Sequence, residues 1–113
     1  MKTFLMTLSV CFAAGNLFTS AVGHGKPNRE IHHVRIKNMV FEPALLQAKA
    51  GDMIQWTNED IVPHTATGPN FDSGPIAPGV TWTVTLNEAG IIAYKCSYHP
   101  TMVARVQVSP PSK

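Results

Sequence analysis

The sequence has 113 residues, of which 44% are hydrophobic and 14% charged, with a formal net charge of +2. A chain of this length forms one domain, and this balance of residues excludes a disordered chain or a coiled coil. No two Lys or Arg residues are adjacent, so the cationic cluster typical of nucleic-acid-binding faces is missing. We therefore expect a single globular domain that does not bind nucleic acid.

The first 23 residues have the pattern of a secretory signal peptide. Met1 and Lys2 give a positive start, residues 4–14 form a mainly apolar stretch, and Ala21-Val22-Gly23 forms a small-residue cleavage pattern. An uncleaved membrane anchor is the alternative, but interruptions keep the apolar run below the roughly 18 residues of a spanning helix; they are Gly15, Asn16, Thr19 and Ser20. The sequence thus predicts a periplasmic or secreted protein that starts at His24 and is not an integral membrane protein once processed.

After a flexible polar leader at 24–30, short extended patterns alternate with turn signals such as Ala50-Gly51-Asp52. The stretch 58–79 contains four prolines and three glycines and is expected to be a functional loop. Extended segments are predicted at 31–36, 45–50, 53–57, 80–86, 91–96 and 103–108. This pattern indicates an all-β fold, an antiparallel Greek-key β-sandwich of seven or eight strands over residues 31–110, with a tail at 111–113.

Two of these segments alternate clearly enough to assign their inward faces. Every second residue is apolar, and the residues between are Thr, Arg or Gln. The inward positions are Trp82, Val84 and Leu86 in one segment and Ala104, Val106 and Val108 in the other. We interpret Trp56 and Trp82 as core aromatics with no redox role.

The mature chain would hold a single cysteine, Cys96, because Cys11 is removed with the signal peptide. Such a cysteine cannot form an internal disulfide in an oxidising compartment. It is therefore buried and inert, oxidised, paired between chains, or bound to a metal.

Cys96, His99 and Met102 lie within seven residues between the last two predicted strands. A thiolate, an imidazole and a thioether form a soft ligand set, and two histidines, one cysteine and an axial methionine are typical of blue-copper sites. His64 supplies the second histidine most economically, because it lies in the long loop after Pro63. The other histidines, His24, His32 and His33, lie near the chain start, and the two consecutive ones point to opposite faces of a strand.

From Ile36 to Val108 the chain resembles the plastocyanin and azurin family of cupredoxins, and within it the amicyanins and pseudoazurins. Cys-x2-His-x2-Met carries most of the resemblance, and its short spacing is similar to that of amicyanins. The other matching pieces are Phe41-Glu42-Pro43, Ala50-Gly51-Asp52, Pro63-His64, Glu88-Ala89-Gly90 and Tyr94.

Two positions differ from the family pattern. Thr65 stands where the family often has an Asn that braces the ligand loop, and Tyr98 stands where it commonly has a proline. Because Tyr98 has a backbone N–H that proline lacks, we expect a second amide hydrogen bond onto the Cys96 sulfur, which would raise the reduction potential.

The resemblance implies a cupredoxin-like sandwich with one type 1 copper ion that cycles between Cu(I) and Cu(II), held by His64, Cys96, His99 and Met102. It implies an electron carrier rather than an enzyme. Redox partners are expected to dock on an apolar patch around His99, formed by Pro63, Tyr98 and Pro100, and the protein is expected to be a monomer.

Several alternatives remain. The first is a periplasmic copper carrier without an electron-transfer role. A detached catalytic module has too few remaining histidines for a copper cluster, and a structural zinc site would leave Met102 unexplained. A mature amino-terminal His24 would also offer a second copper site through its amine and ring.

Overall fold

The computed structural model describes residues 28–111, which form seven β-strands and no helix. The predicted signal peptide, most of the leader and the last two residues of the tail lie outside this range. No helix in the described part of the chain is long and apolar enough to cross a membrane. The strands are β1 (Ile31–Lys37), β2 (Val40–Glu42), β3 (Leu45–Lys49), β4 (Met53–Asn58), β5 (Thr81–Thr85), β6 (Gly90–Lys95) and β7 (Val103–Ser109).

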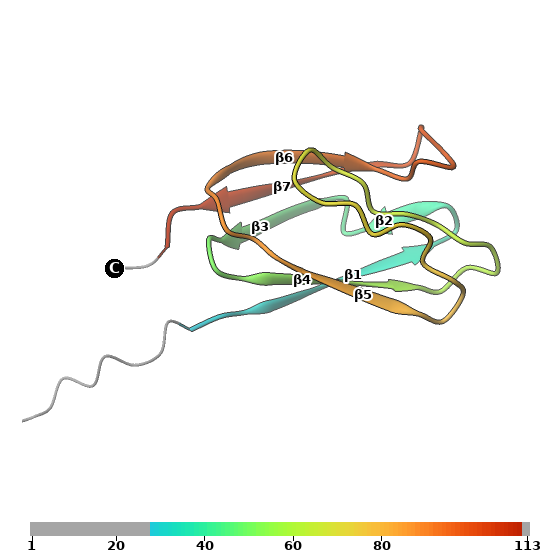
Figure 1. Ribbon diagram of the computed structural model, residues 1–113, viewed down its shortest axis with the longest axis horizontal. Coiled ribbons are helices and arrows are strands. Elements are labelled where there is room, and N and C mark those ends of the chain that lie inside the picture. The colour runs from blue at the N-terminus through green and yellow to red at the C-terminus, as the bar shows by residue number, and fades with distance from the viewer. Residues whose placement is uncertain (1–27, 112–113) are drawn as a thin grey trace, which may run out of the picture.

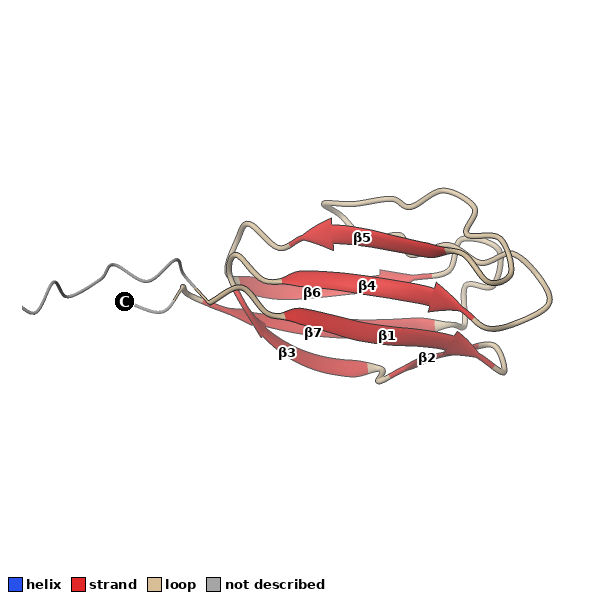
Figure 2. Cartoon of the chain, turned by 90° about the horizontal axis from the view of Figure 1, so that it is seen from below, coloured by secondary structure: helices blue, strands red, loops and turns tan. Residues whose placement is uncertain are grey.

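The strands form two sheets that pack face to face (Figures 1 and 2). One sheet has the order β2-β1-β4-β5 and the other the order β3-β7-β6. The expected all-β sandwich is confirmed, but its pairing is mixed rather than wholly antiparallel, because β1 pairs with β4 and β3 with β7 in parallel. Alternating side chains identify the buried face of a strand and not its direction, so the sequence pattern could not distinguish the two pairings.

The residues predicted to face inward are buried in four cases, Leu86, Ala104, Val106 and Val108, whereas Trp82 and Val84 are half-buried against the core. Trp56 is fully buried, and its ring lies 5.5 Å from the rings of Trp82 and Tyr94, edge-on to the second. Such aromatic contacts add to the free energy gained by removing apolar surface from water. Other members of this core include Val34, Ile36, Ile54, Leu86, Ile92, Ala104, Val106 and Val108.

The predicted turn between β3 and β4 is present and is tied to the start of β1. Gly51 has a φ of 99°, a left-handed conformation that favours glycine. The buried carboxylate of Asp52 accepts hydrogen bonds from the backbone N–H groups of Lys49 (2.9 Å) and Glu30 (3.1 Å) and contacts His32 Nε2 at 2.9 Å. Asp52 therefore links this turn to the strand that begins the domain.

The segment between β4 and β5 contains no strand, as predicted, but it is held at defined points. His64 and Ile76 exchange two backbone hydrogen bonds (3.2 and 2.7 Å), and Thr67 exchanges two with Lys95 of β6 (2.8 and 2.9 Å). These bonds fasten the long loop to the strand that leads into Cys96. The position of His64 is consequently fixed by the main chain.

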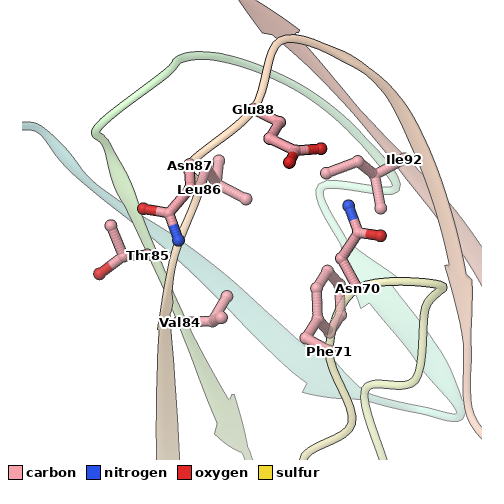
Figure 3. Close-up of a pocket in the computed structure, with 8 residues that line it drawn as sticks. All are labelled: Asn70, Phe71, Val84, Thr85, Leu86, Asn87, Glu88 and Ile92. Atoms are coloured by element: carbon pink, nitrogen blue, oxygen red, sulfur yellow. The ribbon is translucent and has the colours of Figure 1, made fainter.

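A pocket opens between the sheets near β5 and β6, away from this loop contact (Figure 3). Phe71, Val84 and Leu86 contribute apolar walls, and Asn70 and Glu88 lie at its edge. None of the predicted metal ligands lines it. Those residues lie instead in the loops that follow β4 and β6.

Candidate metal centre

The loop 96–102 joins β6 to β7 and is closed by its own backbone. Cys96 N–H donates to Met102 O (3.0 Å), Met102 N–H to His99 O (2.8 Å), and His99 N–H to Cys96 O (3.3 Å). Strands β6 and β7 pair antiparallel up to Lys95 and Val103, so both ends of the loop are fixed. The loop therefore presents its three potential ligands from a constrained backbone.

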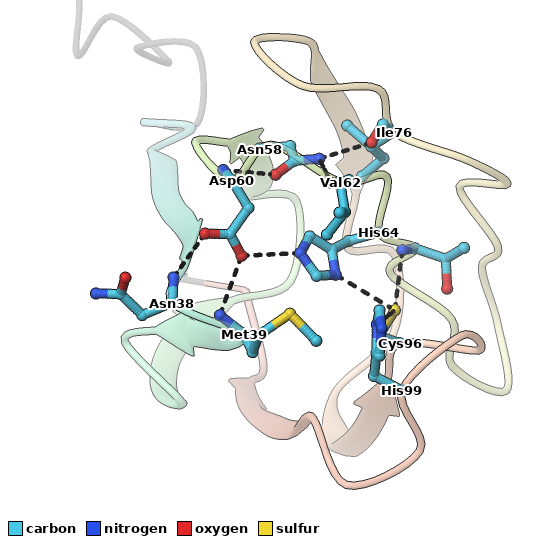
Figure 4. Close-up of polar contacts among 10 residues, drawn as sticks. Asn38, Met39, Asn58, Asp60, Val62, His64, Ile76, Cys96 and His99 are labelled. Carbon is cyan, nitrogen blue, oxygen red and sulfur yellow. Dashed lines mark hydrogen bonds and ion pairs between the residues drawn. The ribbon is translucent and has the colours of Figure 1, made fainter.

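The structure brings His64, Cys96 and His99 together (Figure 4). The Cys96 sulfur lies 3.8 Å from His64 Nδ1 and 3.7 Å from His99 Nδ1, and all three donor atoms lie within 4.8 Å of one another. An ion bonded to one nitrogen and one sulfur at about 2.0 and 2.3 Å in a trigonal arrangement would separate them by roughly 3.7 Å. The observed spacing therefore fits a metal between the three side chains.

Burial distinguishes the members of this group. His64 and Cys96 have no exposed surface, Met102 is 4% exposed, and His99 is partly exposed. A thiol, a thioether and two imidazoles are ligands that suit copper. A metal held here would be screened from water on all sides except that of His99.

One predicted feature of the sulfur environment is wrong. The amide hydrogen bond from Tyr98 to the Cys96 sulfur does not form, and within residues 28–111 the only amide that donates to this sulfur is that of Thr65, at 3.3 Å. The loop turns instead through the bond from His99 N–H to Cys96 O.

Thr65, which stands where the family often has a bracing Asn, also connects the two loops. Its hydroxyl accepts a hydrogen bond from Ser97 N–H (2.7 Å), which connects the His64 loop to the Cys96 loop. The hydroxyl of Thr67 contacts those of Thr65 (2.9 Å) and Ser97 (3.0 Å) and donates to Asp72 (3.1 Å). A network of short polar side chains thus ties the two ligand loops together.

Asp60 is a functional residue that sequence reasoning missed. Its carboxylate accepts hydrogen bonds from His64 Nε2 (2.8 Å), Asn38 N–H (2.7 Å) and Met39 N–H (3.0 Å) (Figure 4). Desolvation acts to raise the pKa of Asp60, but the two amides and His64 outweigh it and lower the pKa below its usual value. The ionised carboxylate fixes the proton on Nε2, so the Nδ1 lone pair faces the sulfur and remains free for a metal.

Asn58 holds the segment that carries Asp60. This fully buried side chain accepts a hydrogen bond from Asp60 N–H (2.9 Å) and donates to Val62 O and Ile76 O, both at 2.8 Å. The spacing of Asp60 and His64, four residues apart, was the available signal in the sequence. It is weak, because residues so spaced in a loop need not meet.

The two other histidines that the structure describes do not join this site. His32 faces Asp52, as described above, and His33 is exposed on the opposite face of β1. His24 lies outside the described residues, so a second copper site there stays a prediction.

Comparison with known proteins agrees with this geometry. Residues 30–109 match the family described as copper binding proteins, plastocyanin/azurin family. Amicyanin-alpha of Methylorubrum extorquens is 33% identical over 82 residues, which cover 66% of this chain and 69% of the relative. Amicyanin of Paracoccus denitrificans is 32% identical over 82 residues, 66% of this chain and 63% of the relative, so the match spans about two thirds of both proteins.

The fold agrees as well. The crystal structure of amicyanin from Paracoccus versutus superposes with a TM-score of 0.65 and 28% identity, covering 70% of this chain and 81% of that one. The family match extends over most of the chain, and its range includes His64, Cys96, His99 and Met102. The chain therefore belongs to the plastocyanin/azurin family of copper-binding proteins and is a cupredoxin similar to amicyanin.

Proposed function

We propose that this cupredoxin is a type 1 copper protein that carries single electrons, with His64, Cys96, His99 and Met102 as the ligands. The observation that supports this function most is the burial of a thiol and an imidazole, fixed by hydrogen bonds, beside a partly exposed histidine. Bound copper supplies one-electron chemistry between Cu(II) and Cu(I).

The chain's contribution is a ligand cage that changes little. Asp60 orients His64, Thr65 ties the loops and donates to the Cys96 sulfur, and the closed loop backbone limits movement of His99. Outer partners that fix ligand orientation also tune the metal they surround. Such rigidity favours electron transfer, because any ligand that has to move adds to the activation barrier.

Partners are proposed to dock around His99. Pro63, Tyr98 and Pro100 are exposed, Tyr98 by 49%, and Ile61 and Val62 next to Pro63 are exposed apolar residues as well. An exposed apolar patch with a polar rim is typical of protein-binding surfaces. This patch would let a partner approach the one ligand that reaches the surface.

The proposed setting is the periplasm or the exterior, where a monomer would shuttle between exported or membrane-bound redox proteins. The export pattern of residues 1–23 supports this location. A lone cysteine held as a metal ligand is also compatible with an oxidising compartment.

Voltammetry of the copper-loaded protein tests the function. We expect a reversible one-electron wave and fast electron self-exchange, both lost in Cys96→Ser. A poorly reversible wave, with copper released to a chelator on reduction, would instead support a copper carrier without an electron-transfer role.

A further inference from the structure

The outer face of the sheet β3-β7-β6 differs from that of the other sheet. Its strands project three large apolar side chains into solvent, Leu45 (68% exposed), Ile91 (65%) and Val103 (62%). In the other sheet, the outward positions of β4 and β5 are mainly Thr and Gln, and its exposed large apolar residues are confined to β1 and β2, with Ile31 (50%) and Val40 (45%). The ten outward residues of the first face are Leu45, Gln47, Lys49, Ile91, Ala93, Lys95, Val103, Arg105, Gln107 and Ser109.

Strand register gathers the apolar residues around one cation. Arg105 of β7 pairs with Leu45 of β3 on one side and Ala93 of β6 on the other. Two residues earlier in β7, next to the loop 96–102, Val103 pairs with Lys95. In the opposite direction a shallow groove crosses the sheet, lined by Leu45, Leu46, Gln47, Ile91, Arg105 and Gln107.

The charges on this face have a single sign. Three of the six Lys and Arg residues between 28 and 111 lie here, Lys49, Lys95 and Arg105, and none of the ten outward residues is a carboxylate. Within the described range, none of these three cations forms an ion pair, whereas Arg35 on the other sheet pairs with Glu59. The seven carboxylates of that range lie elsewhere, so the face is a cationic area on an otherwise acidic domain.

We propose that this face is a docking surface for an acidic protein that presents carboxylates among apolar side chains. An arginine set among apolar side chains is typical of the residues that dominate binding energy at protein interfaces. A membrane is the weaker match, because no outward residue is aromatic, whereas Trp and Tyr are enriched at lipid interfaces.

The position of the face gives it a consequence for electron transfer. Lys95 directly precedes Cys96 and Val103 directly follows Met102, so a partner bound here would cover the strands that carry two ligands. The face shares no residue with the proposed patch around His99. This consequence rests on the proposed electron-carrier function, whereas the docking surface itself does not.

An NMR titration of the copper-loaded, reduced protein tests the proposal. The probe is a soluble synthetic peptide with Leu residues at its centre and Glu residues on both sides. At low salt we expect amide shifts in β3, β6 and β7. Reversing both charges in a Lys95→Glu, Arg105→Glu variant should weaken binding by about 10-fold or more, and Lys37→Glu on β1 should leave it unchanged.

An apolar pair of variants separates docking from simple charge attraction. Ile91→Ser should weaken binding, whereas Ile31→Ser, which alters an exposed isoleucine of the other sheet, should not. Shifts centred on His99, or equal weakening by Lys37→Glu, would overturn the proposal. So would Arg105-dependent binding to phosphatidylglycerol vesicles without peptide binding, which would indicate a membrane surface. The visible copper band of each variant reports an intact metal site, so these failures would leave the proposed function standing.

Discussion

The backbone N–H of Thr65 donates to the Cys96 sulfur over 3.3 Å, while the Thr65 hydroxyl accepts a hydrogen bond from Ser97 N–H over 2.7 Å. One residue thus contacts the central ligand directly and braces the loop that follows it. A thiolate that accepts a hydrogen bond gives less electron density to a metal, which favours the reduced state. Thr65 should therefore influence both the rigidity of the site and its reduction potential.

Replacing Thr65 with Val removes the hydroxyl at nearly constant volume. The Ser97 amide, part-buried, would lose its acceptor, so we expect a loss of about 1–2 kcal/mol in the free energy of unfolding and faster exchange of that amide in the metal-free protein. The reduction potential should fall, because the Thr65 loop is held less firmly against the sulfur. Thr65→Ser retains the hydroxyl and serves as the control; if it changes the potential as much as Thr65→Val, the bracing account is wrong.

Removing the carboxylate in Asp60→Ala should weaken copper binding. His64 would lose the acceptor that fixes its ring, and loss of such a partner typically lowers metal affinity by about 10–100-fold. Competition with a Cu(I) chelator measures this change. Glu59→Ala is the matched control. Glu59 is the neighbouring acid in the sequence, but it accepts a hydrogen bond from Arg35 and does not contact His64. Equal affinities for the two variants would contradict the role of Asp60.

Asp52 should make the stability of the metal-free protein depend on pH. Burial acts to raise its pKa, but bonds from His32 and from the Lys49 and Glu30 amides outweigh it and lower the pKa. A carboxyl with a lowered pKa in the folded state contributes stability above its unfolded pKa of about 3.9, and this contribution is lost as the pH falls through the lower folded value.

Urea unfolding of the wild type and Asp52→Asn measures the effect. We expect a difference of about 2 kcal/mol near neutral pH that shrinks below roughly pH 4. A difference that stays constant down to the acid range would show that the charge of Asp52 does not contribute.

Tyr98→Pro should leave the reduction potential unchanged, because the structure shows no bond from Tyr98 N–H to the sulfur. Voltammetry of the two proteins compares them directly. A lower potential in the proline variant would indicate that this amide does reach the sulfur when copper is bound.

Much of the fold and part of the His64, Cys96 and His99 cluster could be predicted from local patterns. Alternation in the last strand identifies Val106 and Val108 as inward, and both are buried. Cys96 and His99 are close in sequence and lie between two predicted strands. The soft sulfur donors of Cys96 and Met102 favour copper over other metals. These features depend on residues that are close together in the sequence, so they can be recognised without a structure.

The supporting contacts could not be predicted, because they depend on register and loop path. Strands β1 and β4 run parallel, so the β1–β2 turn lies beside the end of β4. Asp60 contacts the amides of Asn38 and Met39 because of this arrangement. Thr65 meets Ser97 across 32 positions in the sequence. Periodicity carries no information on such distant pairs.

The absorption spectrum of the Cu(II)-loaded protein tests the central claim, that Cys96 binds copper together with two imidazoles. We predict an intense visible band from thiolate-to-Cu(II) charge transfer that disappears in Cys96→Ser, while the Tyr98→Pro variant retains it. A colourless protein after loading with cupric salt, or a band that survives in Cys96→Ser, would contradict the account.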